Sequence, residues 1–166
     1  MIKILILVPA YNESGQIANV LKDLKMHGYS NILVVDDGSD DNTAKIARES
    51  AKWVLSHVQN RGLGAALGTG FEFAKRFSPN ILVTFDSDGQ HQASDIQKII
   101  RPIVNNQTDV VIGSRFADLR KAPIARQVLN YISNCITYII YGVNTSDSLS
   151  GLRAFNQKAY RSSRTT

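Results

Sequence analysis

Four short runs of Ile, Val and Leu, each ended by a polar or turn-forming residue, constrain most strongly what this chain can fold into. They cover residues 2–8, 32–35, 81–85 and 110–112. None of them alternates apolar with polar residues, a pattern typical of strands buried on both faces of a parallel sheet. A weaker run at residues 53–55 predicts a fifth strand.

Helical periodicity fills the segments between these runs. In the first segment, Ile17, Val20, Leu21 and Leu24 recur at helical spacing, and Ser14 is the candidate N-cap. Further helices are expected over residues 43–51, 63–77 and 94–104. Alternating strands and helices predict an α/β fold: an open, mostly parallel sheet flanked by helices, with right-handed crossovers. The length of 166 residues favours a single domain, 1–166.

The basic charge of the chain is concentrated in its last third. Residues 1–114 hold 11 Lys/Arg and 12 Asp/Glu, a net charge of −1, whereas residues 115–166 hold 8 and 2, a net charge of +6. This distribution suits a phosphate-bearing partner or an anionic membrane, and no nucleic-acid-binding motif accompanies it. The single cysteine excludes an internal disulfide framework. No secretory signal is recognisable, so a cytoplasmic protein is expected.

An acidic turn follows the run at residues 81–85. Residues two apart in an extended turn point the same way, so Asp86, Asp88 and Gln90 can converge on one point. Two carboxylates and an amide oxygen suit Mg²⁺ or Mn²⁺. The alternative is a solvated turn made of turn-forming residues. His91, a lone histidine, is expected to support the site or the fold rather than to bind the metal.

Two further segments each allow two interpretations. Asp36 and Asp37 end the run at residues 32–35, where a carboxylate can accept hydrogen bonds from a base or a ribose; the alternative is capping of the next helix. In the glycine-rich segment 60–68, small residues favour close packing of a helix against the sheet, and a phosphate-binding loop is the alternative. An amphipathic stretch at 122–143, beside basic residues, is either a core helix or a membrane-facing one.

Six motifs together resemble those of family 2 glycosyltransferases. They lie at residues 8–13, 35–39, 60–62, 86–91, 113–115 and 147–155, in the order and spacing of that family. Within the family, the chain looks like the polyprenyl-phosphate sugar transferases of the dolichol-phosphate mannose synthase type. The resemblance implies the Rossmann-like GT-A fold and inverting, metal-dependent sugar transfer from a nucleotide sugar, with a GDP-, UDP- or dTDP-sugar as donor.

The resemblance also implies roles for individual residues. Those implied to bind the donor are Pro9, Tyr11, Glu13, Val35, Asp37, Asp86, Ser87, Asp88 and Gln90. Those implied to hold the metal, Mg²⁺ or Mn²⁺, are Asp86, Asp88 and Gln90. Those implied to hold the acceptor phosphate are Arg115 and Arg126. Those implied to take part in catalysis are Asp86, Asp88, Arg115, Asp147 and Arg153.

The implied acceptor is a polyprenyl phosphate, with the protein at the cytoplasmic face of the membrane. Family members continue beyond the motif at residues 147–155, so this chain is expected to be incomplete at its C-terminus. Three alternatives stay open: a saccharide acceptor in cell-envelope polysaccharide synthesis, a non-catalytic nucleotide-binding module, and a sugar-nucleotide pyrophosphorylase. The last would need a Gly-rich, Arg-containing loop after the first strand, where residues 9–13 contain neither.

Overall fold

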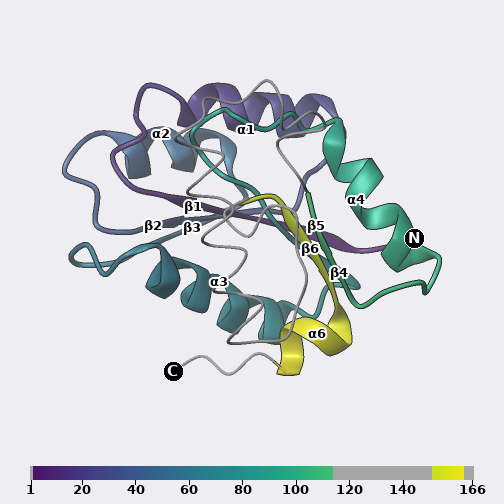
Figure 1. Cartoon of the computed structure of the whole chain (residues 1–166). Coiled ribbons are helices and arrows are strands. Elements are labelled where there is room, and N and C mark those ends of the chain that lie inside the picture. The colour runs from purple at the N-terminus through teal and green to yellow at the C-terminus, as the bar shows by residue number, and fades with distance from the viewer. Residues whose placement is uncertain (1, 114–150, 163–166) are drawn as a thin grey trace, which may run out of the picture.

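The computed structural model describes residues 2–113 and 151–162. Within these residues, a six-stranded sheet has the strand order β3-β2-β1-β4-β6-β5 (Figure 1). The strands are β1 Ile4–Ala10, β2 Ile32–Asp36, β3 Trp53–Ser56, β4 Ile81–Thr84, β5 Val110–Ile112 and β6 Arg153–Asn156. The five strands predicted from the sequence are therefore confirmed.

Strand β6, which was not predicted from the sequence, makes the sheet mixed. It lies between β4 and β5 and runs antiparallel to both, with Arg153 opposite Thr84 on one side and Ile112 on the other. Its four residues include Arg and Asn, so they lack the continuous apolar run that marked the other strands. As a result, Gly151, which lies two residues before β6, lies beside the carboxyl end of β4.

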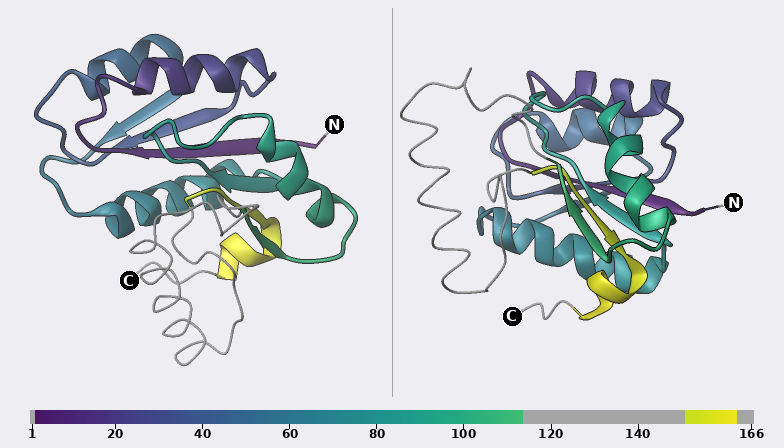
Figure 2. Two further views of the ribbon diagram at one scale, coloured as in Figure 1. Left: turned by 45° about the horizontal axis from the view of Figure 1, so that its top comes forward. Right: turned by 45° about the vertical axis from the view of Figure 1, so that its right-hand side comes forward.

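Helices cover both faces of the sheet, as Figures 1 and 2 show. The helices are α1 Ile17–Met26, α2 Thr43–Ser50, α3 Leu63–Phe77, α4 Asp95–Val104 and α6 Gln157–Ser162. Side chains from α1, α2 and α4 pack in one core cluster, and side chains from α3 and α6 pack in the other. The four predicted helices are confirmed, and α6 was not predicted.

The predicted N-cap of α1 is wrong. Helix α1 is preceded by Gln16, which makes no side-chain capping bond. Ser14 instead uses its backbone amide, which donates to Asp41 Oδ2 at 3.1 Å. That bond ties the segment before α1 to the loop after β2.

Burial of strand β1 on both faces explains why its sequence is apolar without alternation. Ile6 and Val8 belong to the core cluster under α1 and α4, and Leu5 and Leu7 belong to the cluster under α3. All four side chains are fully buried, because helices pack on both faces of the strand. Strand β5 departs from this pattern: it lies at the edge of the sheet, and Val110 is 39% exposed.

No helix among residues 2–113 and 151–162 has the length and hydropathy needed to cross a bilayer. The amphipathic stretch at 122–143 lies outside the described residues.

Helix α3 approaches β1 closely at Gly70. A Cβ built on Gly70 would lie 2.3 Å from both terminal carbons of Leu7. The Leu7 side chain is fully buried, so it has little room to move away. A Cβ on Gly64, near the start of the same helix, would meet nothing within 4 Å.

We therefore expect Gly70→Ala to lower the free energy of unfolding by about 1–3 kcal/mol through overpacking. Gly64→Ala is the matched control and should be neutral or raise stability by up to about 1 kcal/mol, because alanine favours the helix. Urea denaturation of both variants measures the difference. Equal effects would show that α3 does not need the glycine for its approach to β1.

Candidate active site

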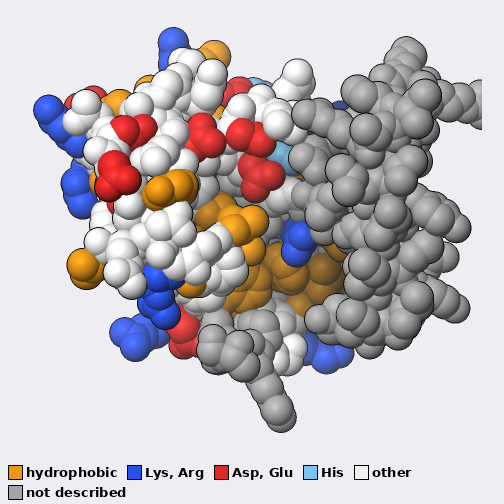
Figure 3. All heavy atoms as spheres, turned by 60° about the vertical axis from the view of Figure 1, so that its left-hand side comes forward, with side chains coloured by type: hydrophobic (Ala, Val, Ile, Leu, Met, Phe, Trp, Pro, Cys, Tyr) orange, Lys and Arg blue, Asp and Glu red, His pale blue; other side chains and the backbone are white. Residues whose placement is uncertain are grey.

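A pocket of about 370 Å³ opens at the carboxyl ends of β1, β2 and β4. Its lining residues are Pro9, Ala10, Tyr11, Glu13, Asp37, Asn60, Gly62, Leu63, Ala66, Asp86, Ser87 and Asp88. Seven of the nine residues implied to bind the donor are in this set. On the face shown in Figure 3, acidic side chains gather beside apolar ones.

The loop after β1 is held by the loop after β2. The Asn12 amide donates to Ser39 Oγ at 2.9 Å, and the Glu13 amide donates to Thr43 Oγ1 at 2.8 Å. Asn12 has a φ of 54°, the left-handed conformation that asparagine tolerates better than most residues. These bonds fix the backbone that carries Tyr11 and Glu13 to the pocket wall.

Carboxylates crowd one side of this pocket. The pKa of Glu13 is raised, first by its burial and then by the negative charges of Asp88 and Asp41. In contrast, hydrogen bonds from Thr43 and Ser14 lower the pKa of Asp41 to about 2. Because Glu13 lies near two other carboxylates, a bound cation would favour its charged form.

Asp86, Ser87 and Asp88 reach the pocket from the turn after β4. Asp88 Oδ1 accepts a hydrogen bond of 2.9 Å from the backbone amide of Gln90. His91 is buried, with Nε2 4.0 Å from Asp86 Oδ2. This placement agrees with the expectation that His91 supports the site.

Gln90 and Val35 do not lie on the pocket wall. Gln90 is exposed, and its backbone amide contacts Asp88. Val35 is fully buried in the core cluster beneath α3. The turn at residues 86–91 bends away after Asp88, so the regular two-residue spacing assumed from the sequence does not carry Gln90 into the pocket.

The described residues contain no cluster of three or more His, Cys, Asp or Glu side chains arranged around a metal position. Asp86 and Asp88 line the pocket together, and their oxygens are the ligands that Mg²⁺ and Mn²⁺ prefer. Mg²⁺ is commonly held by one or two carboxylates, with water and substrate phosphates completing the shell. The two carboxylates fit a cation of this kind.

Gly151 lies directly against the Asp86 side chain. A Cβ built on Gly151 would lie 1.8 Å from Asp86 Oδ1 and 1.9 Å from Oδ2. The Gly151 carbonyl oxygen accepts a hydrogen bond of 2.8 Å from Thr84 Oγ1. Arg153 follows on β6, opposite Thr84, and is partly buried. The described part of the motif at residues 147–155 therefore forms one side of the space that the Asp86 side chain occupies.

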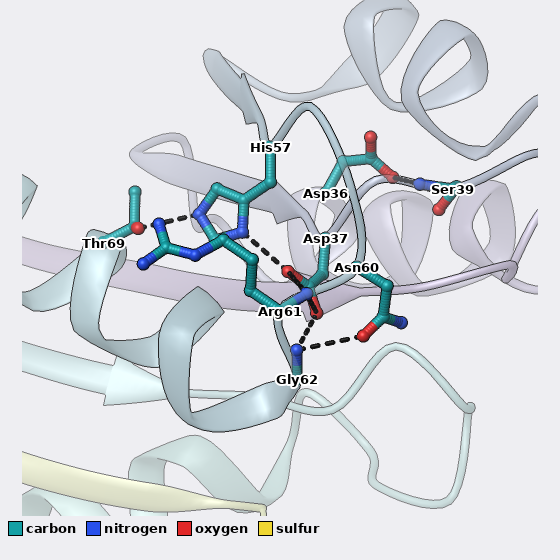
Figure 4. A network of polar contacts seen from close by, with 8 residues as sticks. All are labelled: Asp36, Asp37, Ser39, His57, Asn60, Arg61, Gly62 and Thr69. Atoms are coloured by element: carbon teal, nitrogen blue, oxygen red, sulfur yellow. Dashed lines mark hydrogen bonds and ion pairs between the residues drawn. The ribbon is translucent and has the colours of Figure 1, made fainter.

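Asp37 holds the loop that leads into α3, as Figure 4 shows. Its carboxylate accepts hydrogen bonds from the backbone amides of Arg61, at 3.1 and 3.2 Å, and Gly62, at 2.7 Å. Asp36 makes a longer contact of 3.4 Å with the amide of Ser39 in its own turn. Of the two carboxylates, Asp37 lines the pocket and Asp36 does not.

The predicted role of the glycine-rich segment in close packing is wrong for Gly62 and Gly64. A Cβ on either residue would meet nothing within 4 Å. Gly62 has a φ of 87°, which glycine adopts without strain, and its amide faces Asp37. The close approach to the sheet occurs two turns further along α3, at Gly70.

Three residues with expected roles lie outside the described part of the chain. They are Arg115, Arg126 and Asp147.

Comparison with known proteins identifies the family. The sequence model of glycosyl transferase family 2 matches residues 5–163, nearly the whole chain. The chain belongs to this family. The motifs that suggested it include the segments that form the pocket wall, at residues 9–13, 37 and 86–88.

Two relatives illustrate the similarity. The chain is 46% identical over 160 residues to an uncharacterised protein of Methanocaldococcus jannaschii, and the matched region covers 95% of this chain and 66% of that protein. It is 39% identical over 178 residues to a UDP-N-acetylglucosamine–dolichyl-phosphate N-acetylglucosaminyltransferase of Methanococcus voltae, covering 95% of this chain and 71% of the enzyme. The chain thus spans about two thirds of the length of these relatives.

The fold is that of GT-A glycosyltransferases. The structure superposes with a TM-score of 0.70 on glucosyl-3-phosphoglycerate synthase from Mycobacterium tuberculosis, solved in complex with Mn²⁺, UDP-glucose and phosphoglyceric acid. The superposition covers 94% of this chain and 57% of the synthase, at 20% sequence identity. It confirms the predicted fold class.

The contact between Gly151 and Asp86 can be tested without a ligand. We expect Gly151→Ala to lower the free energy of unfolding by about 0.5–1.5 kcal/mol, because the partly exposed Asp86 side chain must leave its rotamer to make room for the methyl group. In an Asp86→Ala background the overlap is gone, so the same substitution should cost less by about 0.5–1.5 kcal/mol. Urea denaturation of the four proteins in this cycle measures the coupling.

Gly15→Ala is the control for this cycle, since a Cβ on Gly15 meets nothing within 4 Å. Its effect should be the same with and without the Asp86 carboxylate. An equal cost of Gly151→Ala in both backgrounds would contradict the contact.

Proposed function

We propose that this chain belongs to an inverting glycosyltransferase that moves a sugar from a nucleotide sugar to a polyprenyl phosphate, and that residues 2–113 form its donor-binding and metal-binding part. One observation carries the proposal: Asp86 and Asp88 share a pocket with Tyr11, Glu13 and Asp37 at the carboxyl ends of parallel strands. Open α/β sheets bind ligands at this edge. Membership of glycosyl transferase family 2 supports the same conclusion.

The Methanococcus voltae relative supports the choice of donor and acceptor. Its name gives a UDP-sugar as donor and dolichyl phosphate as acceptor, and it is 39% identical to this chain. A UDP-sugar is accordingly the first donor to test, ahead of GDP- and dTDP-sugars. A polyprenyl phosphate is the acceptor class.

Asp86 and Asp88 would hold Mg²⁺ or Mn²⁺. The metal, when bound, would neutralise charge on the diphosphate of the donor as the nucleotide leaves. Pro9, Leu63 and Ala66 present apolar surface on the same wall and would exclude water from the bound nucleotide. The crowding that raises the pKa of Glu13 favours a cation at this side of the pocket.

The acceptor would need positioning more than activation. A phosphate oxygen is already anionic near neutral pH, so a strong general base is unnecessary. Arg115 and Arg126 are proposed to hold the phosphate by charge-assisted hydrogen bonds, and Asp147 and Arg153 are proposed to take part in catalysis. The net charge of +6 over residues 115–166 also suits an anionic membrane surface, and we place the protein at the cytoplasmic face.

Asp88→Asn tests the metal-dependent donor site. The substitution removes an anionic ligand but keeps an oxygen that can accept the bond from the Gln90 amide, so the fold should persist. We expect it to weaken Mn²⁺-dependent binding of a UDP-, GDP- or dTDP-sugar by at least about tenfold in calorimetry. Asp95→Asn, a partly exposed carboxylate paired with Lys98 on α4, is the control and should bind as the wild type does. Unchanged metal-dependent binding in Asp88→Asn would reject the assignment.

Arg115→Ala tests the acceptor site. We expect weaker binding of polyprenyl phosphate, by about tenfold, with nucleotide affinity nearly unchanged, because the arginine would contact the acceptor phosphate alone. Arg101→Ala, on α4, is the control for loss of one positive charge. Binding to detergent-solubilised polyprenyl phosphate and to the nucleotide is measured separately. Equal losses for the two ligands would move Arg115 to the donor side.

A further inference from the structure

We infer that His57 is a positioning residue for the donor pocket: with Thr69 it fixes Asp37, and Asp37 fixes the backbone of Arg61 and Gly62 at the pocket wall. No sequence motif assigned a role to His57 or Thr69. The inference rests on the proposed function, since the pocket is the one in which the donor nucleotide would bind.

The register of the sheet brings His57 next to Asp37. Strands β2 and β3 are parallel, with Asp36 opposite Ser56, so the residues that follow them leave the sheet side by side. The His57 backbone amide donates to the Asp36 carbonyl oxygen at 2.9 Å and continues this pairing. Asp37 and His57 therefore meet although 20 residues separate them in the sequence.

Both ring nitrogens of His57 have partners, as the close-up in Figure 4 shows. Nδ1 lies 2.6 Å from Asp37 Oδ1, and Nε2 lies 2.8 Å from Thr69 Oγ1 on α3. The side chains of His57 and Asp37 are only 9% and 4% exposed. A hydrogen bond between such buried groups is costly to remove, because water does not replace the lost partner.

The chemistry of Asp37, His57 and Thr69 determines which group donates in each of the two hydrogen bonds. A carboxylate only accepts hydrogen bonds, so His57 donates from Nδ1 to Asp37. The Thr69 hydroxyl both donates and accepts, so it satisfies Nε2 in the neutral ring and in the charged ring alike. The ring is thus held between β2 and α3 in either protonation state.

Asp37 transmits this restraint to the pocket. Its two oxygens accept hydrogen bonds from three donors, which are the His57 ring, the Gly62 backbone amide and the Arg61 backbone amide, the last shared between both oxygens. Asn60 and Gly62 line the pocket beside Asp37 itself. With most of its capacity used by the protein, Asp37 acts on a bound nucleotide largely through the loop that it holds.

Gly38 fixes the same loop from a second direction. It has a φ of 72°, and a Cβ built on it would lie 2.4 Å from the Gln59 carbonyl carbon. The backbone at residues 59–60 therefore lies tightly against the turn after β2. The loop is therefore restrained at residues 59–60 by Gly38 and at residues 61–62 by Asp37, whose carboxylate His57 in turn holds.

Four variants remove the hydrogen bonds of His57 to different extents. His57→Phe keeps an aromatic ring and loses both bonds. His57→Asn keeps a donor near the Nδ1 position and loses the bond to Thr69. Thr69→Val loses only the hydroxyl, and Thr69→Ser keeps it. His27→Phe, at an exposed histidine after α1, is the control for loss of an imidazole.

Two measurements on the full chain test the inference. Amide hydrogen exchange at residues 60–62 reports the loop directly, and calorimetry with UDP, GDP and dTDP in the presence of Mn²⁺ reports the pocket. We expect His57→Phe to accelerate amide exchange at residues 60–62. We also expect it to lower, by about tenfold, the affinity for whichever of the three nucleotides the wild type binds. His57→Asn and Thr69→Val should show smaller changes in the same direction, of about two- to threefold. Thr69→Ser and His27→Phe should match the wild type.

The outcomes separate this inference from the proposed function. A wild-type chain that binds none of the three nucleotides with Mn²⁺ would reject the proposed function, and the inference with it. A wild-type chain that binds one, with His57→Phe binding it equally well or exchanging at the wild-type rate, would reject the inference alone. If His57→Phe does not fold, the comparison of Thr69→Val with Thr69→Ser decides by the same two measurements. A purely structural role would lower the melting temperature without changing the affinity of the folded protein.

Discussion

The parallel pairing of β1 with β2 on one side and β4 on the other is the interaction on which the rest of the structure depends. It places Ala10 opposite Asp36, and Leu7 opposite Thr84. The bonding continues one residue past β2 and β4, where the amides of Asp37 and Phe85 donate to carbonyl oxygens of β1. Three loops therefore leave the sheet at one edge, and the pocket forms between them.

Those loops hold one another in place as much as the sheet holds them. The turn after β2 supplies Ser39 to the loop after β1 and Asp37 to the loop after β3, and the first residue of α2, Thr43, also holds the loop after β1. Each bond joins a side chain of one loop to a backbone amide of another. A wall built in this way is formed before a ligand arrives, which lowers the entropy cost of binding.

The crowding of the carboxylates of Glu13, Asp41 and Asp88 at the pocket lowers the stability of the fold without a ligand but suits the binding of a cation. Burial and the charges of Asp88 and Asp41 raise the pKa of Glu13, so its ionised form is less stable in the folded protein than in the unfolded chain. The fully buried side chains of β1 supply stability that offsets this effect. Such local conflicts are expected where a protein binds a ligand of opposite charge.

The sequence alone determined the five strands of the apolar runs, the four helices between them and the carboxylates at strand ends. These features follow from local patterns, because burial on both faces needs an unbroken apolar run and a helix needs its 3.6-residue repeat. Tertiary structure decided the rest. It placed β6 between β4 and β5, set Gly151 against Asp86, turned Gln90 to solvent and joined His57 to Asp37. Those contacts either link residues that are distant in the sequence or depend on how one turn bends. Local periodicity in the sequence predicts neither kind of contact.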